Sequence, residues 1–166
     1  TWIGSPHPDF SYSLNIVLKY KGFDLSAYFQ GVQGIDVENW LKKQTDFWSV
    51  DDVNSNKGVR LLNAWTPQNP TSTIPALQTT NNNDEGRLSN YFIENGSYMK
   101  LRNLSLGYTL PTATASRLRM SRLRIYVTGQ NLFTVKSKNF TGVDPENVGW
   151  GYPIPTTWTA GVNIGF

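Results

Sequence analysis

The 166-residue sequence has no cysteine, few charged residues and no long apolar run. Without cysteine, it can form neither disulfides nor thiolate metal sites. No stretch reaches the roughly 18 apolar residues of a transmembrane helix. This absence leaves a membrane β-barrel open, because barrel strands need only about 9–11 residues and are half polar. An initiator Met and an apolar leader are also missing, so we expect a processed product or a fragment.

Charged residues make up 16% of the chain, and the net charge is +3. Much of the positive charge is local, in Arg117, Arg119, Arg122 and Arg124. Nucleic-acid binding would require stacking aromatics between such cations, and only Tyr126 lies near them. We therefore interpret the arginines as a solvated turn and expect no nucleic-acid partner.

No catalytic or metal-binding arrangement is found in the sequence. The single histidine, His7, lies between two prolines, and nothing signals partners for it. The segments 36–40 and 142–147 offer carboxylates of the kind that bind calcium, but neither matches an EF-hand loop. In the second of them, we expect Asp144 to bond its own backbone in a proline turn. We predict a protein that is not an enzyme and has no cofactor; calcium in the long loops is an unfavoured alternative.

Five segments alternate apolar and polar residues with a period of two, which predicts strands. In the last segment, Trp158, Ala160, Val162 and Ile164 alternate with polar or small residues before the terminal Phe166. The predicted strands cover residues 10–20, 23–31, part of 91–110, 122–133 and 157–166.

The third strand has an irregular pattern. Met99 and Leu101 have the opposite parity to Leu104 and Leu106, so the strand's register around 98–108 stays open. A β-bulge near 102–103 would place both pairs on one face.

The connections between strands alternate in length. Residues 19–22 and 110–121 are short turns, whereas 32–90 and 135–156 are long and irregular. Outer-membrane barrels have short periplasmic turns and longer external loops, and the sequence follows that pattern. Within the first long loop, we expect a short helix in 37–48 with Asp36 as its N-cap.

A secreted, carbohydrate-binding β-sandwich is the alternative, because period two alone does not separate it from a barrel. A sandwich would cover Leu14, Leu25, Val127 and Val162 with a second sheet. The loop asymmetry and the terminal aromatic residue favour the barrel.

Aromatic residues near the strand ends are typical of membrane-interface girdles. They are Phe10, Tyr12, Tyr20, Phe23, Trp158 and Phe166. Four further tryptophans fall in the long loops, either packing these loops or contacting a partner or ligand: Trp40, Trp48, Trp65 and Trp150. On the polar side of the last strands, the candidates for lining a passage are Tyr126, Thr128, Gln130 and Asn163.

Several stretches resemble the C-terminal end of SusC/RagA-type TonB-linked outer-membrane proteins. They are "SNYFIENGSYMKLRNLSLGYTLP", "VTGQNLFT", "FTGVDPE" and "YPIPTTWTAGVNIGF". "IGSPHPDFSYSLNIVLKYKGFDLSAYFQG" and "NAWTPQNPTSTIPAL" are similar to the preceding hairpin and external loop. The alternating positions from Trp158 to Phe166 resemble the C-terminal signal that delivers barrels to their assembly machinery.

The resemblance implies an all-β fold in which residues 1–166 are the last five antiparallel strands of a 22-stranded barrel, not an independent domain. It also implies an N-terminal plug and a TonB contact, both outside this chain. A SusD-like surface lipoprotein would cap the barrel, and two such pairs would form a dimer. The protein would import oligosaccharides or oligopeptides across the bacterial outer membrane. Neither the ligand nor the lipoprotein is identified by the sequence.

Overall fold

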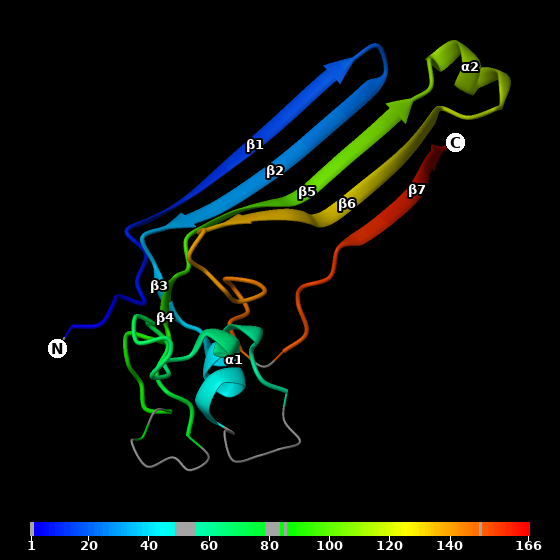
Figure 1. Cartoon of the computed structure of the whole chain (residues 1–166). Helices are drawn as coiled ribbons and strands as arrows, with labels where there is room; N and C mark the ends of the chain where they lie inside the picture. Colours follow the sequence, from blue (N-terminus) through cyan, green and yellow to red (C-terminus); the bar gives the residue numbers. More distant parts are fainter. Residues whose placement is uncertain (1, 49–55, 79–83, 85, 150) are drawn as a thin grey trace.

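The computed structural model describes residues 2–48, 56–78, 84, 86–149 and 151–166. Five antiparallel strands form one long sheet in the order β1-β2-β5-β6-β7 (Figure 1). They are β1 (Phe10–Tyr20), β2 (Phe23–Gln33), β5 (Tyr98–Thr109), β6 (Arg122–Lys136) and β7 (Thr157–Gly165). The predicted all-β architecture of five antiparallel strands is confirmed, with β2 and β6 extending beyond their predicted ends.

The hairpin between β1 and β2 follows from its two turn residues. Lys21 and Gly22 both have positive φ, at 45° and 89°, as in the two-residue turns that match the twist of paired strands. A side chain at Gly22 would also lie 2.7 Å from the Thr109 carbonyl oxygen. Glycine therefore satisfies both the turn conformation and the close approach of β5.

The β-bulge predicted in the third strand is confirmed at Arg102. Tyr28 of β2 pairs with Asn103, but the next residue, Phe29, pairs with Leu101, so Arg102 has no partner. The extra residue changes the parity of β5 at this point. Met99 and Leu101 consequently share a face with Leu104 and Leu106.

The 110–121 connection contains a short helix, α2 (Thr112–Arg117), where the sequence predicted only a turn. Two of the arginines assigned to that turn belong to a strand instead, because Arg122 and Arg124 lie in β6. We call this end of the sheet, which also holds the 21–22 turn, the turn end.

At the opposite end, the long connections fold into a small body beside the sheet (Figure 1). We call the described parts of 34–97 and 137–156 the loop body. Strand β3 (Asp36–Glu38) pairs with β4 (Ile93–Asn95), and a 3-10 helix covers Val59–Asn63. Its buried apolar side chains are Phe47, Leu61, Ala64, Phe92 and Phe140. The prediction of an irregular 32–90 region is thus wrong in part.

The predicted helix exists but begins later than expected. Helix α1 covers Trp40–Lys43 and continues into a π-helical turn over Gln44–Trp48. Its N-cap is Asn39, whose Oδ1 accepts a 2.9 Å hydrogen bond from the Lys42 N–H. The assignment of Asp36 as N-cap is wrong, because Asp36 lies in β3 and accepts the Ser5 N–H. Neither described α-helix is long and apolar enough to cross a membrane.

The bulge generates the first prediction. Deleting Arg102 from the full-length protein would turn the side chains of 98–101 to the opposite face, since strand side chains alternate with period two. We expect the deletion to abolish the SDS-resistant, heat-modifiable band of a folded barrel on electrophoresis.

Arg102→Ala is the matched control, because it removes the same side chain while keeping the residue count. It should retain the folded band, as should deletion of Gly86, which lies outside the sheet and where an added Cβ would meet no atom within 4 Å. A folded band after deletion of Arg102 would contradict the role of the bulge.

Candidate functional site: the two faces of the sheet and the loop body

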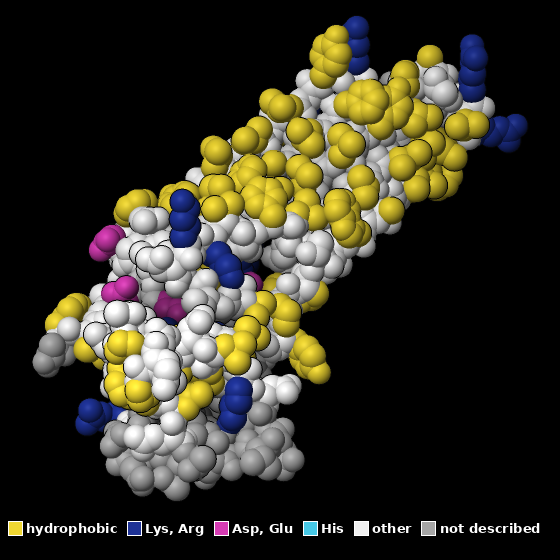
Figure 2. Space-filling view, viewed as in Figure 1, with side chains coloured by type: hydrophobic (Ala, Val, Ile, Leu, Met, Phe, Trp, Pro, Cys, Tyr) yellow, Lys and Arg dark blue, Asp and Glu magenta, His cyan; other side chains and the backbone are white. Residues whose placement is uncertain are grey.

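One face of the sheet is apolar and open to its surroundings. The strand register places Ile16, Ala27, Leu104 and their neighbours together on this face. Figure 2 shows hydrophobic side chains along the length of the sheet. Large side chains on this face include Leu14, 55% exposed, Val162, 55% exposed, and Ile164, 48% exposed.

Nothing in the described part of the chain forms a second layer over this apolar face, since the other sheet is only the β3–β4 pair. Leu14, Val127 and Val162 are exposed, and Leu25 is half-buried. The β-sandwich alternative, which needed these four residues covered, does not fit. An uncovered apolar area of this extent requires an apolar environment.

The last strand contributes to the apolar face in the predicted way. Trp158, Ala160 and Val162 lie opposite Gly129, Val127 and Ile125 of β6. Ile164 lies opposite Leu123, and Phe166 follows the end of β7 with 94% of its surface exposed. The five positions assigned to an assembly signal therefore include four side chains on one continuous apolar face.

The opposite face is polar and collects the four residues predicted to line a passage. Tyr126, Thr128 and Gln130 of β6 lie opposite Gly161, Thr159 and Thr157 of β7. Asn163 lies on the same face, opposite Arg124. The Thr128 hydroxyl donates a 3.1 Å hydrogen bond to the Ser105 hydroxyl on β5.

An ion pair spans three strands on this polar face. Arg124 Nε of β6 donates a 2.9 Å hydrogen bond to Asp24 Oδ1 of β2, and a second bond joins Nη2 to Oδ2. Between them lies Gly107 of β5, where an added Cβ would sit 2.4 Å from the Arg124 guanidinium. Because Gly107 has no side chain, the Arg124 side chain can cross β5 and reach Asp24. The solvated-turn interpretation of Arg124 is wrong, because its guanidinium binds Asp24. The alternation of apolar and polar residues does not reveal a partner 100 positions away.

At the end of the sheet next to the loop body, which we call the loop end, side chains of the polar face bind the β6–β7 connection. Lys100 of β5 has a side chain only 2% exposed, and its Nζ lies 2.7 Å from both Asp144 oxygens and 2.6 Å from Glu146 Oε2. Glu146 also accepts hydrogen bonds from Tyr98 and Arg102. Sequence reasoning missed Lys100; the signal that could have found it is a cation on the polar side of a predicted strand.

The turn predicted at Asp144 is confirmed, because its Oδ1 accepts a 2.9 Å hydrogen bond from the Glu146 N–H. Burial alone would raise the pKa of Glu146, but hydrogen bonds from Lys100, Tyr98 and Arg102 outweigh it and lower this pKa. Within the described residues, no three His, Asp or Glu side chains group together to hold a metal ion.

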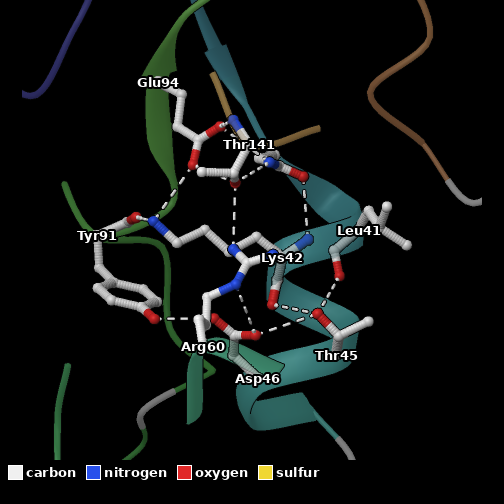
Figure 3. Close-up of polar contacts among 9 residues, drawn as sticks. Leu41, Lys42, Thr45, Asp46, Arg60, Tyr91, Glu94 and Thr141 are labelled. Atoms are coloured by element: carbon white, nitrogen blue, oxygen red, sulfur yellow. Dashed lines mark hydrogen bonds and ion pairs between the residues drawn. The ribbon is translucent and has the colours of Figure 1, made fainter. Parts of the chain in front are cut away.

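A second polar network holds the loop body together (Figure 3). Glu94 on β4 accepts hydrogen bonds from Asn39 Nδ2 at 2.9 Å and from the Thr141 N–H and hydroxyl at 2.8 Å each. Lys42 Nζ lies 3.3 Å from Glu94 and donates to the Tyr91 carbonyl at 2.6 Å. One carboxylate thereby joins the cap of α1, strand β4 and the β6–β7 connection.

Asp46 belongs to the same network and lies at the opposite end of it from Glu94 (Figure 3). Its side chain is buried, and Oδ2 accepts a 2.8 Å hydrogen bond from the Tyr91 hydroxyl. The Arg60 guanidinium lies 3.7 Å from Oδ1 and also donates to the Thr141 hydroxyl. Burial and the bond to Asp46 raise the pKa of Tyr91. Figure 3 shows these side chains converging from the π-helical turn after α1, the 3-10 helix, the residues just before β4 and the β6–β7 connection.

Two of the four loop tryptophans, Trp40 and Trp65, have side chains that the structure describes. Trp40 and Trp65 are 39% and 40% exposed, which leaves part of each ring available for contact. The Lys43 ammonium lies 4.8 Å from the Trp40 ring centroid. The Trp48 side chain and Trp150 lie outside the described residues.

A hollow of about 430 Å³ lies between the start of α1 and the 142–153 segment. Asn39 and Leu41 line one side, and Val143, Asn147 and Tyr152 line the other. Tyr152 is 96% exposed, and its carbonyl accepts a hydrogen bond from the Asn147 amide. The mixed apolar and amide lining could accept an organic ligand of moderate size.

The Glu94 network predicts a pH dependence of the loop body. Burial opposes ionisation of Glu94, yet the hydrogen bonds and Lys42 lower its pKa below the ordinary value of 4.5. A lowered folded-state pKa stabilises the folded form above the unfolded pKa, and this contribution is lost as pH falls through the folded value. We expect amide-exchange protection at Thr141 to decrease as the pH falls below 4.5, after correction for intrinsic exchange.

Glu94→Gln is the matched variant, since it keeps the shape and removes the titration. It should have lower protection at neutral pH, because Lys42 loses its counter-charge, and a flatter pH profile. An unchanged acid-sensitive profile in this variant would contradict the assignment to Glu94.

Comparison with known proteins connects this geometry to one family. No family model matches the chain. TonB-dependent receptor P3 of Formosa agariphila is 32% identical over 99% of the chain, which spans 17% of that relative. TonB-dependent receptor SusC of Bacteroides thetaiotaomicron is 28% identical over 97% of the chain, which spans 15% of that relative.

The solved structures of RagAB agree. A structure of the RagAB peptide transporter superposes with a TM-score of 0.79 at 29% identity, covering 98% of the chain and 18% of the RagAB chain. The "closed-closed" structure of the RagAB peptide importer gives 0.79 at 28% identity. The relatives are receptors and transporters, which confirms the prediction that the chain is not an enzyme. Both the sequence and the fold therefore show that the chain belongs, as a segment, to the SusC- and RagA-type TonB-dependent receptors of the bacterial outer membrane.

Proposed function

We propose that residues 1–166 form barrel wall and external loops of an importer that takes oligosaccharides or oligopeptides across the outer membrane. The observation that supports this most directly is the single-layer sheet, with an uncovered apolar face on one side and a polar face on the other. Barrel strands expose apolar residues to lipid and polar residues to the lumen. Here Tyr126, Thr128, Gln130 and Asn163 are the proposed lumen residues.

The open edges of the sheet support a larger barrel. β1 and β7 each pair on one side only within the described structure. Unpaired backbone groups are costly in hydrocarbon, so membrane-spanning sheets close into barrels. Residues 1–166 are accordingly proposed to be a part of that barrel and not an independent domain. We propose that they are the last five of 22 strands, with the plug and the TonB contact upstream.

The loop body is the proposed docking region for a SusD-like surface lipoprotein. It lies at the end of the sheet opposite the turn end (Figure 1). Trp40 and Trp65 offer partly exposed rings there, and Trp48 and Trp150 are proposed from their sequence positions alone.

The named relative RagAB is a peptide importer. A peptide or a glycan is therefore the proposed cargo, and a dimer of transporter–lipoprotein pairs is the proposed assembly.

Excision of residues 64–75 from the full-length protein tests the lipoprotein contact. This segment closes on itself, because the Trp65 N–H donates to the Ile74 carbonyl at 2.9 Å and Ser72 donates to the Asn63 carbonyl at 2.6 Å. Its removal takes out one small buried side chain, Ala64, and keeps the three buried phenylalanine rings and the buried leucine of the loop body, so the rest of the loop body should stay folded. We expect loss of co-purification with the lipoprotein and loss of uptake of the cargo.

The control is Leu118→Ser, which changes an exposed apolar residue at the opposite end of the sheet and should keep both properties. Co-purification that survives the excision would contradict the docking role of this loop. A full-length protein absent from the outer membrane would contradict the importer as a whole.

The terminal residue tests the assembly signal. Deleting Phe166 should lower the amount of full-length protein in the outer membrane, because the last aromatic side chain of the signal is lost. Quantitative blotting of outer-membrane fractions measures the effect, with Phe166→Tyr as the conservative control. Normal insertion after the deletion would count against the signal.

A further inference from the structure

Positive charge gathers at the turn end of the sheet. Residues 19–24 and 109–124 contain six Lys or Arg side chains, and Asp24 is their only Asp or Glu. In the face that Figure 2 shows, Lys and Arg side chains lie beside hydrophobic ones at this end, and acidic side chains lie only toward the loop body. Asp24 is paired with Arg124, so five cations of these two segments have no carboxylate from the same segments.

Three of these cations lie in the connections beyond the strand ends. Lys21 belongs to the β1–β2 turn, and Arg117 and Arg119 belong to the β5–β6 connection. We call these three residues the basic rim. The two connections are neighbours, because the Gly22 carbonyl accepts the Thr109 N–H at 2.7 Å. The three rim side chains are exposed, and none forms an ion pair with a described residue.

Aromatic rings of the apolar face adjoin the basic rim. Tyr20 lies opposite Phe23 in the β1–β2 register, and the rings of Phe23 and Tyr108 stack with their centroids 4.5 Å apart. The Lys21 ammonium lies 5.1 Å from the centroid of the Tyr20 ring, which is 69% exposed. An aromatic ring with a cation at its edge is typical of a membrane–water interface. Lys21 is therefore at the margin of the surface that we propose to face lipid.

The length of β1 places the basic rim at the level of lipid headgroups. Eleven residues form β1. With a rise of about 3.4 Å per residue and a tilt of about 40°, such a strand spans roughly 26–29 Å along the membrane normal. The apolar band of a barrel is about 25 Å tall. When Phe10 lies at the outer boundary of this band, Tyr20 lies at the inner one, and Lys21 is the first residue in the headgroup layer of the periplasmic leaflet.

We propose that the basic rim binds the phosphate groups of anionic glycerophospholipids, such as phosphatidylglycerol, in the periplasmic leaflet. The proposal rests on the proposed function, because it needs the apolar face in the membrane. Ammonium and guanidinium groups donate charge-assisted hydrogen bonds to phosphate, and basic side chains at a bilayer surface attract anionic lipids. The acyl chains of the same lipids would lie on the apolar face next to Tyr20. Headgroup and chains thus meet adjoining surfaces, a match that a soluble acidic protein does not provide.

Photolabelling of the full-length protein in lipid vesicles tests the site. One vesicle preparation contains phosphatidylglycerol with a photoreactive group next to its phosphate, and the other contains phosphatidylcholine with the same acyl chains and the same group. Mass spectrometry of peptides locates the adducts. We expect adducts in residues 20–23 and 117–120, about tenfold more abundant with phosphatidylglycerol. Added salt should reduce this difference, because it screens exposed charges.

The test variant replaces Lys21, Arg117 and Arg119 together with Gln. It should lower labelling by phosphatidylglycerol to the level of phosphatidylcholine and leave the heat-modifiable band of the folded barrel unchanged. The charge-preserving variant, Lys21→Arg with Arg117→Lys and Arg119→Lys, should keep the wild-type labelling. The matched control is Lys19→Gln with Arg122→Gln, which removes charge from the polar face at the same end and should also keep it.

Four results would overturn the lipid site. Equal labelling of the basic rim by both lipids would show that charge is not recognised. Loss of labelling in the Lys19 and Arg122 control would show a general effect of charge. Full competition by free glycerol 1-phosphate would identify a site for soluble anions, and displacement of the lipid by periplasmic extract would identify a protein as occupant. Failure of the importer is different, since the full-length protein would then be absent from the outer membrane.

Discussion

Hydrocarbon cannot form hydrogen bonds with a protein backbone, and this constraint accounts for most of the structure. Apart from the outer edges of β1 and β7, the five strands satisfy one another's backbone groups through antiparallel pairing. Their apolar side chains then need no second layer of protein, because lipid replaces it. The same constraint explains why the sheet has almost no core of its own. Most of its large apolar residues are exposed in the isolated chain, while the well-buried phenylalanines, such as Phe92, belong to the loop body.

The loop body meets a different physical demand, because its apolar core is small. Two buried carboxylates, Glu94 and Asp46, replace much of the missing apolar packing by joining segments far apart in the chain. A buried carboxylate is stabilising only when its oxygens are bonded, and Glu94 accepts bonds from Asn39 and twice from Thr141. Hydrogen-bond geometry is directional, so such a network also fixes the relative position of the segments.

The sequence predicted local features well and distant partnerships poorly. Period-two alternation depends only on neighbouring residues, and it located all five strands and the bulge at Arg102. Helix capping was predicted at the wrong residue because Asp36 and Asn39 are both good caps, and strand pairing in β3 decides between them. The contacts of Lys100 with Asp144 and of Arg124 with Asp24 join residues 44 and 100 positions apart. No local pattern encodes those separations; only the folded sheet brings the residues together.

The two ends of the polar face differ in how their charges are balanced. At the loop end, Lys100 and Arg102 are matched by Asp144 and Glu146, all within this chain. At the turn end, Asp24 pairs with Arg124, while Lys19, Lys21 and Arg122 line the hollow beside this pair without an ion pair to any described residue. These three side chains are exposed, so water can stabilise their charges. The buried ammonium of Lys100 has no such access to water and is stabilised by the two carboxylates beside it.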